Sequence, residues 1–247
     1  FEANSSLTNI GDSAFRGCAA LTIITIPDNV TTIGDKAFAE CNALETVNLP
    51  TNELFTTIGS FAFSVCGLTS ITIPNSVTTI RNSAFQSCTS LENVFLPNNE
   101  LFTKIEDSAF LGCNALTSIT IPDNVTTIGT YAFYNCTALE NVNLPNNELF
   151  TTIGGYGFYK CSTLTSITIP NSVKDISGNA FQNCGLTSIT IPDNVTTIGD
   201  NAFLGNNFTT AISVTLDYTD WFDETQRIFG IANDSSIFNF RNIPPPV

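Results

Sequence analysis

The sequence predicts a repeat solenoid of α/β type in which strands predominate, and two observations lead to this prediction. Phenylalanine recurs at a nearly constant interval, from Phe15 through Phe38 and Phe63 to Phe203. Each unit reads approximately I-G-x-x-A-F-x-x-C-x-x-L-x-x-I-x-I-P-x-x-V-T-T, so its apolar residues keep fixed offsets. A constant period of about 20 to 30 residues is typical of solenoids, in which each coil covers the apolar faces of its neighbours.

Each unit contains a short strand that ends at a proline. In the third unit, Ile71 and Ile73 alternate with polar residues, which is the period of a half-buried strand. Pro74 has no amide hydrogen to give to a sheet and therefore ends the strand. Asn75 and Ser76 then supply turn chemistry.

The other part of each unit carries the phenylalanine and a cysteine. In the second unit, Gly34 and Asp35 have the pattern of a turn followed by a helix N-cap. We therefore expect one short helical or 3-10 turn that carries Phe38 and Cys41. Every coil would send its Leu, Ile, Val, Ala, Phe and Cys side chains inward, into a core that about nine coils share.

Coil length varies in an orderly way. The turn after the strand is longer in the second, fourth and sixth units, at 51–55, 98–102 and 146–150. Long units thus alternate with short ones as far as the sixth, which gives this part of the chain a super-period of two units. Because all three insertions occupy the same place in the repeat, we expect a bulge along one edge of the coil.

The domain prediction is one solenoid over residues 1–216, followed by a C-terminal cap and a proline-rich linker over 217–247. The chain opens without Met and its residues 7–10 match the latter half of a repeat, so we interpret the N-terminus as a processed or excised edge. After Leu216 the register is lost, and Trp221, Phe222, Ile228 and Phe229 suit a short amphipathic segment that seals the core. Solenoids need such caps, because the last coil would otherwise expose its interior.

These residues resemble the BspA-like leucine-rich repeats, the fifth class of the leucine-rich repeats, over about residues 7–203. The consensus of that family is similar to C-x-x-L-x-x-I-x-I-P-x-x-V-x-x-I-G-x-x-A-F, which nearly every unit matches. The resemblance implies a right-handed coil with a parallel sheet on its concave face. It also implies a secreted or surface-attached protein of host-associated bacteria or protists that acts in adhesion. The family has no shared catalytic residues, so the resemblance implies no site.

Composition limits the classes of partner. The net charge is −14, from 8 Lys and Arg against 22 Asp and Glu. Such acidity argues against binding to nucleic acid or to anionic membranes, which need basic patches, and it also keeps an isoleucine-rich stack soluble. No run of about 18 apolar residues exists, so we expect no membrane span.

The eight cysteines hold the same place in successive units, from Cys18 to Cys184. An even count in a secreted chain favours disulfides. However, coils about 4.8 Å apart would hold the Cβ atoms farther apart than the roughly 3.8 Å typical of a disulfide. We expect a ladder of buried free thiols. Zinc is disfavoured, because the chain has no His and no C-x-x-C pair.

The sequence offers no catalytic group. The absence of His removes Ser-His and Cys-His nucleophile pairs, and Glu106 and Asp107 are adjacent, so they do not converge on one point. Calcium would be the best-suited ion for the carboxylates between Asp217 and Glu224, but their spacing is not that of an EF-hand, and helix capping and solvation explain them better. We predict no enzyme, no metal site and no cofactor.

Two surfaces are candidate binding sites. The outward residues of the strands form a neutral face of Ser, Thr and Asn with one large aromatic residue: Thr46, Asn48, Ser70, Thr72, Asn93, Phe95, Ser118, Thr120, Asn141 and Asn143. Solvation of a sheet is the alternative interpretation. Tyr131 and Tyr156, with Tyr134 and Tyr159, form a second candidate, because tyrosine clusters favour contacts with proteins or sugars; ordinary edge packing is the alternative.

Asn-x-Ser/Thr sequons at Asn29, Asn124 and Asn194 fall in one exposed turn column, which fits glycosylation in a eukaryotic host. The functional prediction is an extracellular or cell-surface adhesion module, which binds protein or glycan partners through its neutral concave face. The alternative is a structural rod that associates with identical chains in a wall, sheath or filament.

Overall fold

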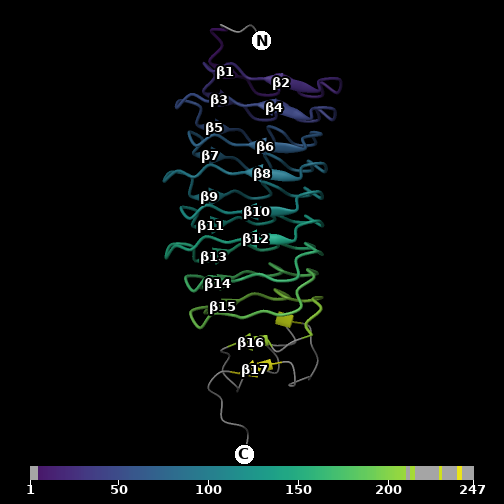
Figure 1. Cartoon of the computed structure of the whole chain (residues 1–247), viewed down its shortest axis with the longest axis vertical. Coiled ribbons are helices and arrows are strands. Elements are labelled where there is room, and N and C mark those ends of the chain that lie inside the picture. The colour runs from purple at the N-terminus through teal and green to yellow at the C-terminus, as the bar shows by residue number, and fades with distance from the viewer. Residues whose placement is uncertain (1–4, 210–211, 215–227, 230–237, 241–247) are drawn as a thin grey trace, which may run out of the picture.

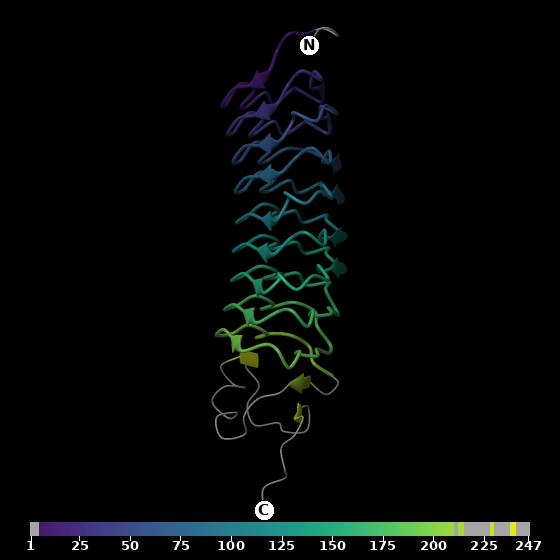
Figure 2. The same cartoon turned by 90° about the vertical axis from the view of Figure 1, so that its left-hand side faces the viewer.

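The chain folds into an elongated stack of coils (Figure 1). The computed structural model describes residues 5–209, 212–214, 228–229 and 238–240. Figures 1 and 2 show that the stack runs nearly straight along its long axis, so the face expected to be concave is close to flat. The right-handed winding implied by the resemblance stays a prediction.

The coils up to β13 (Thr152–Ile153) contribute strands to two sides of the stack, whereas the coils that contain β14 (Asp175–Ile176) and β15 (Thr197–Ile198) continue only the side of two-residue strands (Figure 2). Three-residue strands form one side, as sheets β2–β4 and β6–β8–β10–β12. Their bounds are β2 (Ile23–Thr25), β4 (Thr46–Asn48), β6 (Ser70–Thr72), β8 (Asn93–Phe95), β10 (Ser118–Thr120) and β12 (Asn141–Asn143). We call the outward side of these six strands the strand face.

Two-residue strands form the other side, as sheets β1–β3–β5–β7 and β9–β11–β13–β14–β15. Their bounds are β1 (Asn9–Ile10), β3 (Thr32–Ile33), β5 (Thr57–Ile58), β7 (Thr79–Ile80), β9 (Lys104–Ile105), β11 (Thr127–Ile128), β13 (Thr152–Ile153), β14 (Asp175–Ile176) and β15 (Thr197–Ile198). All described strand pairs are parallel, and they join equivalent residues, such as Ile33 with Ile58. The register therefore stacks each residue of a coil on its own counterpart, which places like on like along every column.

The segment that carries the phenylalanine is not helical, so the prediction of short helical or 3-10 turns, and with it the α/β type, is wrong. In the second coil, the amides of Lys36, Phe38 and Glu40 donate to carbonyls of the next coil at 2.8 Å. The amides that alternate with them close β-turns within the coil; the amide of Cys41, for example, donates to the carbonyl of Phe38. Successive amides thus alternate between donating to the next coil and donating within their own coil, whereas in a helix all of them would donate within the same segment. The described solenoid is a β-solenoid.

The predicted N-cap also has a different partner. Asp35 Oδ1 accepts a hydrogen bond from the amide of Ser60 in the next coil at 2.8 Å. Asp12 and Asp107 do the same for the amides of Asp35 and Thr130. These carboxylates therefore join coils and do not begin helices.

This hydrogen-bonding pattern requires a left-handed backbone at two positions in each turn, two residues before and two residues after the phenylalanine. In the second coil these are Lys36 and Glu40, with φ of 57° and 65°. The later coils use the same two places, with Asn or Gly at several of them, which tolerate this conformation. Val65, with φ of 58°, is β-branched and stands out among them. We call these five-residue segments the phenylalanine turns.

The core consists of parallel columns. In the main column each ring stacks on the next with centroids 5.1–5.5 Å apart and planes within 13°, through Phe15, Phe38, Phe63, Phe85, Phe110, Phe133, Phe158, Phe181, Phe203 and Phe229. Such distances are in the favourable range for offset aromatic pairs. A second column alternates by size, with all members fully buried: Val30, Phe55, Val77, Phe102, Val125, Phe150 and Val173. Its phenylalanines belong to the three longer coils, so extra chain length and extra core volume come together.

The cysteines form the expected ladder of free thiols, which confirms that prediction for every member except the exposed Cys18. Each buried Sγ donates to the carbonyl of the core phenylalanine one coil earlier, at 3.0 Å for Cys41 to Phe15 and 3.3 Å for Cys136 to Phe110. Burial raises the pKa of Cys136 to about 12, because the apolar surroundings disfavour the thiolate. The thiols are therefore neutral structural hydrogen-bond donors.

Asn206 replaces the cysteine in the ninth coil. Its Nδ2 donates to the carbonyls of Phe181 and Phe203 at 2.8 and 2.7 Å, and its Oδ1 accepts from the amide of Leu186 at 3.1 Å. The side-chain amide of Asn206 thus donates to the phenylalanine carbonyl of the preceding coil, as the thiols do in the other coils, and also to the phenylalanine carbonyl of its own coil. The change of residue keeps the ladder intact at its last position.

Beyond residue 209 the described segments continue the stack. Ile228 and Phe229 are buried, Phe229 stacks on Phe203 at 5.2 Å, and the carbonyl of Ile228 accepts from the amide of Phe203. β16 (Ile212–Val214) also pairs in parallel with β17 (Phe238–Phe240). The rest of 217–247, including Trp221, Phe222 and the proline-rich tail, lies outside the described residues, and the predicted division at residue 216 stays a prediction.

Candidate functional site

The strand face presents the predicted binding residues of the strands. In each three-residue strand the middle side chain points into the core and the outer two are exposed. Parallel pairing then aligns the outer residues in two columns, as in Ser118 with Asn141 and Thr120 with Asn143. The structure therefore brings the ten predicted strand residues together on one surface.

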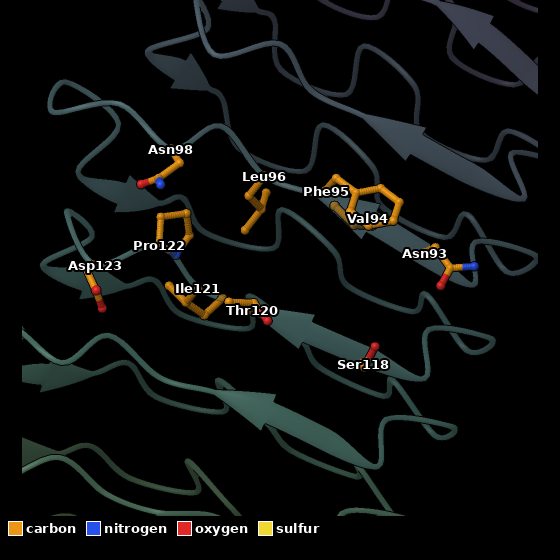
Figure 3. Close-up of a pocket in the computed structure, with 10 residues that line it drawn as sticks. All are labelled: Asn93, Val94, Phe95, Leu96, Asn98, Ser118, Thr120, Ile121, Pro122 and Asp123. Atoms are coloured by element: carbon orange, nitrogen blue, oxygen red, sulfur yellow. The ribbon is translucent and has the colours of Figure 1, made fainter.

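Phe95 is the most prominent side chain of the regular columns. It is 60% exposed, although it has the volume and polarity of a core residue. It lies at a depression of about 360 Å³ between β8 and β10, which Asn93, Ser118 and Thr120 also line (Figure 3). A large exposed aromatic ring beside a hollow is a common feature of binding surfaces.

Phe95 interrupts a column of side-chain hydrogen bonds between neighbouring strands. Elsewhere in this column, Asn48 Nδ2 donates to Thr25 Oγ1 at 3.0 Å and Asn143 Nδ2 donates to Thr120 Oγ1 at 3.1 Å. Phe95 stands at the asparagine position, opposite Thr72, and can make no such bond.

Among the described residues, the side chains of Asn93 and Ser118 have no hydrogen-bond partner either. The ring is thus accompanied by an amide and two hydroxyl groups, counting Thr72, that are available to a ligand.

Carboxylates border the neutral strip. Glu45, Glu92 and Glu140 are exposed immediately before β4, β8 and β12. Asp123, after β10, lines the Phe95 depression, and its Oδ1 accepts from the amide of Asn146 at 3.0 Å. The strand face is therefore uncharged along its centre and acidic along its margins.

The tyrosines form a compact quartet on the phenylalanine turns, away from the Phe95 depression. Tyr131 stacks on Tyr156 and Tyr134 on Tyr159, each with ring centroids 4.8 Å apart. Contacts of 5.6 and 5.5 Å at steep angles join the two stacks, and Lys160 Nζ lies 5.5 Å from the Tyr159 ring. Tyr131 and Tyr156 therefore do not belong to the strand-face site.

The three sequon asparagines lie in one column of turns, as expected. Asn29 and Asn194 are exposed, whereas Asn124 is half-buried. The Nδ2 atoms of Asn29 and Asn194 donate to the carbonyls of Ser5 and Asn171 at 2.8 and 2.9 Å. A glycosylated amide keeps one hydrogen, so these bonds are compatible with an attached sugar; glycosylation stays a prediction.

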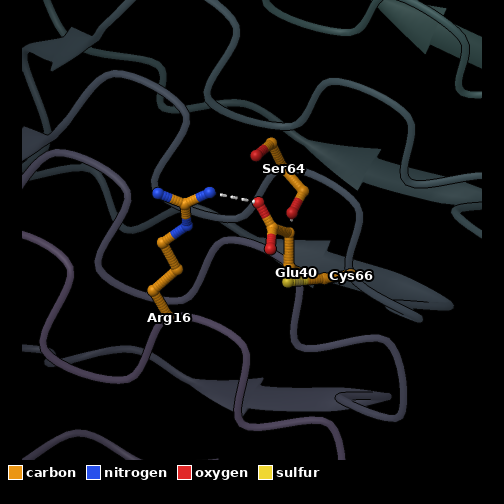
Figure 4. A network of polar contacts seen from close by, with 4 residues as sticks. All are labelled: Arg16, Glu40, Ser64 and Cys66. Carbon is orange, nitrogen blue, oxygen red and sulfur yellow. Dashed lines mark hydrogen bonds and ion pairs between the residues drawn. The ribbon is translucent and has the colours of Figure 1, made fainter.

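Several charged groups of the described residues have structural partners. Glu106 pairs with Lys104 at 2.6 Å, and Arg16 pairs with Glu40 across two phenylalanine turns at 2.6 Å (Figure 4). Such exposed pairs contribute about 0–1 kcal/mol each. Within the described ranges, no group of three or more Cys, Asp and Glu is placed to hold a metal ion, and no helix there could cross a bilayer. The carboxylates between 217 and 224 lie outside these ranges.

Sequence reasoning missed three exposed leucines in the longer turns. Leu54, Leu101 and Leu149 are 70%, 72% and 71% exposed. The pattern Glu-Leu-Phe in each insertion was a usable signal, because a buried phenylalanine in a turn leaves the preceding residue outside.

Comparison with known proteins identifies the repeat. Residues 8–102 and 99–210 match the family described as the BspA type leucine rich repeat region. A search of curated proteins finds no match.

Solved structures of bacterial leucine-rich repeat proteins are similar to the chain. A Treponema pallidum leucine-rich repeat protein is 30% identical, with a TM-score of 0.58 over 64% of this chain and 72% of the other. A leucine-rich cell surface protein from Faecalibacterium prausnitzii is 28% identical, with a TM-score of 0.56 over 93% and 74%. A Bacteroides ovatus leucine-rich repeat protein, 24% identical with a TM-score of 0.52 over 96% and 88%, shares the fold. On the match of its repeats, the chain belongs to the BspA-type leucine-rich repeat family.

Proposed function

We propose that this protein is a non-enzymatic extracellular or cell-surface adhesion module that binds a protein or glycan partner on the strand face, centred on Phe95. The observation that carries the proposal is the exposed Phe95 ring, at the asparagine position of a hydrogen-bonded column. An aromatic ring flanked by free amide and hydroxyl groups suits a sugar ring or an aromatic or aliphatic side chain.

The setting of the proposal comes from the family and from charge. A structure with the same fold and 28% identity is a cell surface protein. The acidic margins of the strand face disfavour anionic partners such as nucleic acid, and the neutral centre favours uncharged ones. None of the sequon residues Asn29, Asn124 and Asn194 lines the Phe95 depression.

The experiment is a screen of immobilised glycans and matrix proteins, followed by affinity measurements on the variant Phe95→Asn. This substitution restores the residue found at the equivalent positions Asn48 and Asn143, so the fold should tolerate it. We expect loss of binding without loss of stability. As a matched control, Leu101→Asn removes an exposed apolar residue elsewhere and should leave the same binding intact. Equal binding by Phe95→Asn and by Asn93→Glu would refute the strand-face site.

A structural rod is the second candidate function, and the straight, continuous core favours it (Figures 1 and 2). Stacked rings from Phe15 to Phe229 and parallel ladders on two sides make a stiff element. This function requires that identical chains associate. Light scattering over a range of concentrations distinguishes it from adhesion, since an adhesion module would stay at constant mass.

A further inference from the structure

The three longer turns form a regular ridge along one edge of the stack. Each presents an exposed Glu-Leu pair: Glu53 and Leu54, Glu100 and Leu101, Glu148 and Leu149. The turns between β8 and β9 and between β12 and β13 project beyond the shorter turns at the left-hand edge of Figure 1. We call these six residues the Glu-Leu ridge.

The ridge is held rigidly by one asparagine per turn. Asn99 Nδ2 donates to the carbonyls of Asn75 and Val77 in the preceding coil, both at 2.8 Å. Its Oδ1 accepts from the amides of Leu101 and Phe102, both at 2.9 Å. Asn52 and Asn147 occupy the same place and make the corresponding bonds to the preceding coil and to the amides of Leu54 and Leu149.

A buried phenylalanine also holds each of these turns in place. The residue after the leucine, Phe102 in the middle turn, is fully buried and anchors each turn from below. The backbone at three leucines about 70% exposed is therefore held in place, and their exposed area gains nothing for folding. Because the turn backbone is already ordered, a partner that covers these leucines pays little entropy for ordering the loop, which favours binding.

The spacing of the ridge selects the shape of the partner. Two distances measure the rise of the stack per coil. Paired strands lie about 4.8 Å apart, and the centroids of stacked phenylalanine rings lie 5.1–5.5 Å apart. Leucines two coils apart are thus separated by about 10–11 Å. An α-helix rises about 10.5 Å in seven residues, which returns the same face to the ridge. An extended strand repeats a face every 6.6–6.8 Å or so, so it cannot set one apolar residue against each successive leucine.

Charge selects the composition of the partner. Glu53, Glu100 and Glu148 are exposed, and none of the ion pairs among the described residues includes them. With a net charge of −14, the chain attracts cations and repels anionic membranes. A second copy of this ridge would oppose glutamate to glutamate, so self-pairing of ridges is disfavoured.

We propose that the Glu-Leu ridge docks a basic amphipathic α-helix of another protein, with an apolar residue at every seventh position and Lys or Arg beside it. The helix would lie along the stack, with its apolar residues against Leu54, Leu101 and Leu149 and its basic residues near the three glutamates. This surface is separate from the Phe95 depression, so the two proposals stand or fall independently.

The test uses a synthetic helical peptide that carries leucine at four successive heptad positions and lysine beside each leucine. A control peptide has the same length and composition with leucine at every fifth position, which scatters the leucines around the helix. A proline-rich peptide with leucine at every third position repeats its face every 9.3 Å or so and serves as the extended alternative. Fluorescence anisotropy with the whole chain measures all three affinities at low and high salt.

We expect the heptad peptide to bind at least about tenfold more tightly than either of the others, and more weakly at high salt. Leu101→Asn should weaken its binding about tenfold or more, because one buried leucine contributes about that factor, and the triple leucine variant should abolish it. The matched control Ile23→Asn, at another exposed apolar residue, should bind normally.

Three results would overturn the proposal: equal binding of the heptad and control peptides, unchanged binding by the triple variant, or tighter binding of the proline-rich peptide. Self-association of the chain that the triple variant abolishes would also overturn it, since the ridge would then belong to a second copy.

Discussion

The left-handed backbone of the phenylalanine turns gives the sharpest test of the fold, at Gly112. This residue has φ of 73° and follows Phe110 by two positions, where its amide donates to the carbonyl of Tyr134 in the next coil at 2.7 Å. A methyl group added at Gly112 would meet its nearest atom, Ser87 Oγ, at 3.5 Å, which is ordinary contact. Gly112→Ala therefore changes the backbone preference without a steric clash.

The expected magnitude follows from two opposing effects. Alanine in the left-handed region costs about 1–2 kcal/mol, and the reduced freedom of the unfolded chain returns about 0.4–1 kcal/mol. Gly112→Ala should thus lower the free energy of unfolding by about 1 kcal/mol. Gly11→Ala is the matched control, because Gly11 is not left-handed and has open space around it. It should raise stability by about 0.4–1 kcal/mol.

The assay is urea denaturation followed by far-UV circular dichroism, with midpoints compared at equal slope. A Gly112→Ala midpoint equal to or above that of the wild type would refute the left-handed turn. If Gly11→Ala lost as much stability as Gly112→Ala, the cost would belong to any added methyl group and the argument from backbone conformation would fail.

Three further predictions concern the thiol ladder and its end. Asn206→Ala leaves the carbonyl of Phe181 without its side-chain donor and should cost about 1–3 kcal/mol in the same assay; a change below about 0.5 kcal/mol would contradict the role of Asn206. In the native protein, Ellman's reagent should modify Cys18 alone, with the buried thiols reacting only on unfolding; fast modification of several thiols would show that the ladder is open. The pKa of Cys136 rises from 9.0 to about 12 on folding, so the unfolded chain binds fewer protons between these values. This thiol's contribution to stability should be complete below pH 9 and fall by about 1.4 kcal/mol per pH unit above it; Cys136→Ala should reduce that slope, and an identical slope would refute the assignment.

The sequence was sufficient for the architecture because every coil repeats the same inward residues. The alternation at Ile71 and Ile73 predicted a strand, and the common offset of the cysteines predicted a ladder without disulfides. The phenylalanine turns were mispredicted because Gly34 and Asp35 have the local pattern of a helix start. The competing partner, the carbonyl of the next coil, lies a whole repeat away along the chain and leaves no local signal.

The candidate site was predictable only in part. Strand alternation placed the outer residues of β8 and β10 correctly, and Phe95 was visible as the odd member of a polar column. The loss of the Asn-Thr hydrogen bond at Phe95 required coordinates, because it depends on which side chains face each other across coils. The exposure of Leu101 was likewise hidden, since leucine in a repeat is usually a core residue.

The size alternation in the second core column makes two coils, and not one, the natural unit of length for this protein. Deleting one short coil would set a large ring such as Phe55 directly against Phe102, where a valine now separates them, and the excess volume would strain both neighbours. Removing or adding one long coil together with one short coil instead preserves every neighbour relation in that column. A designer who needs a longer or shorter rod from this chain should therefore add or remove coils in pairs. Each pair would change the length of the rod by about 10 Å.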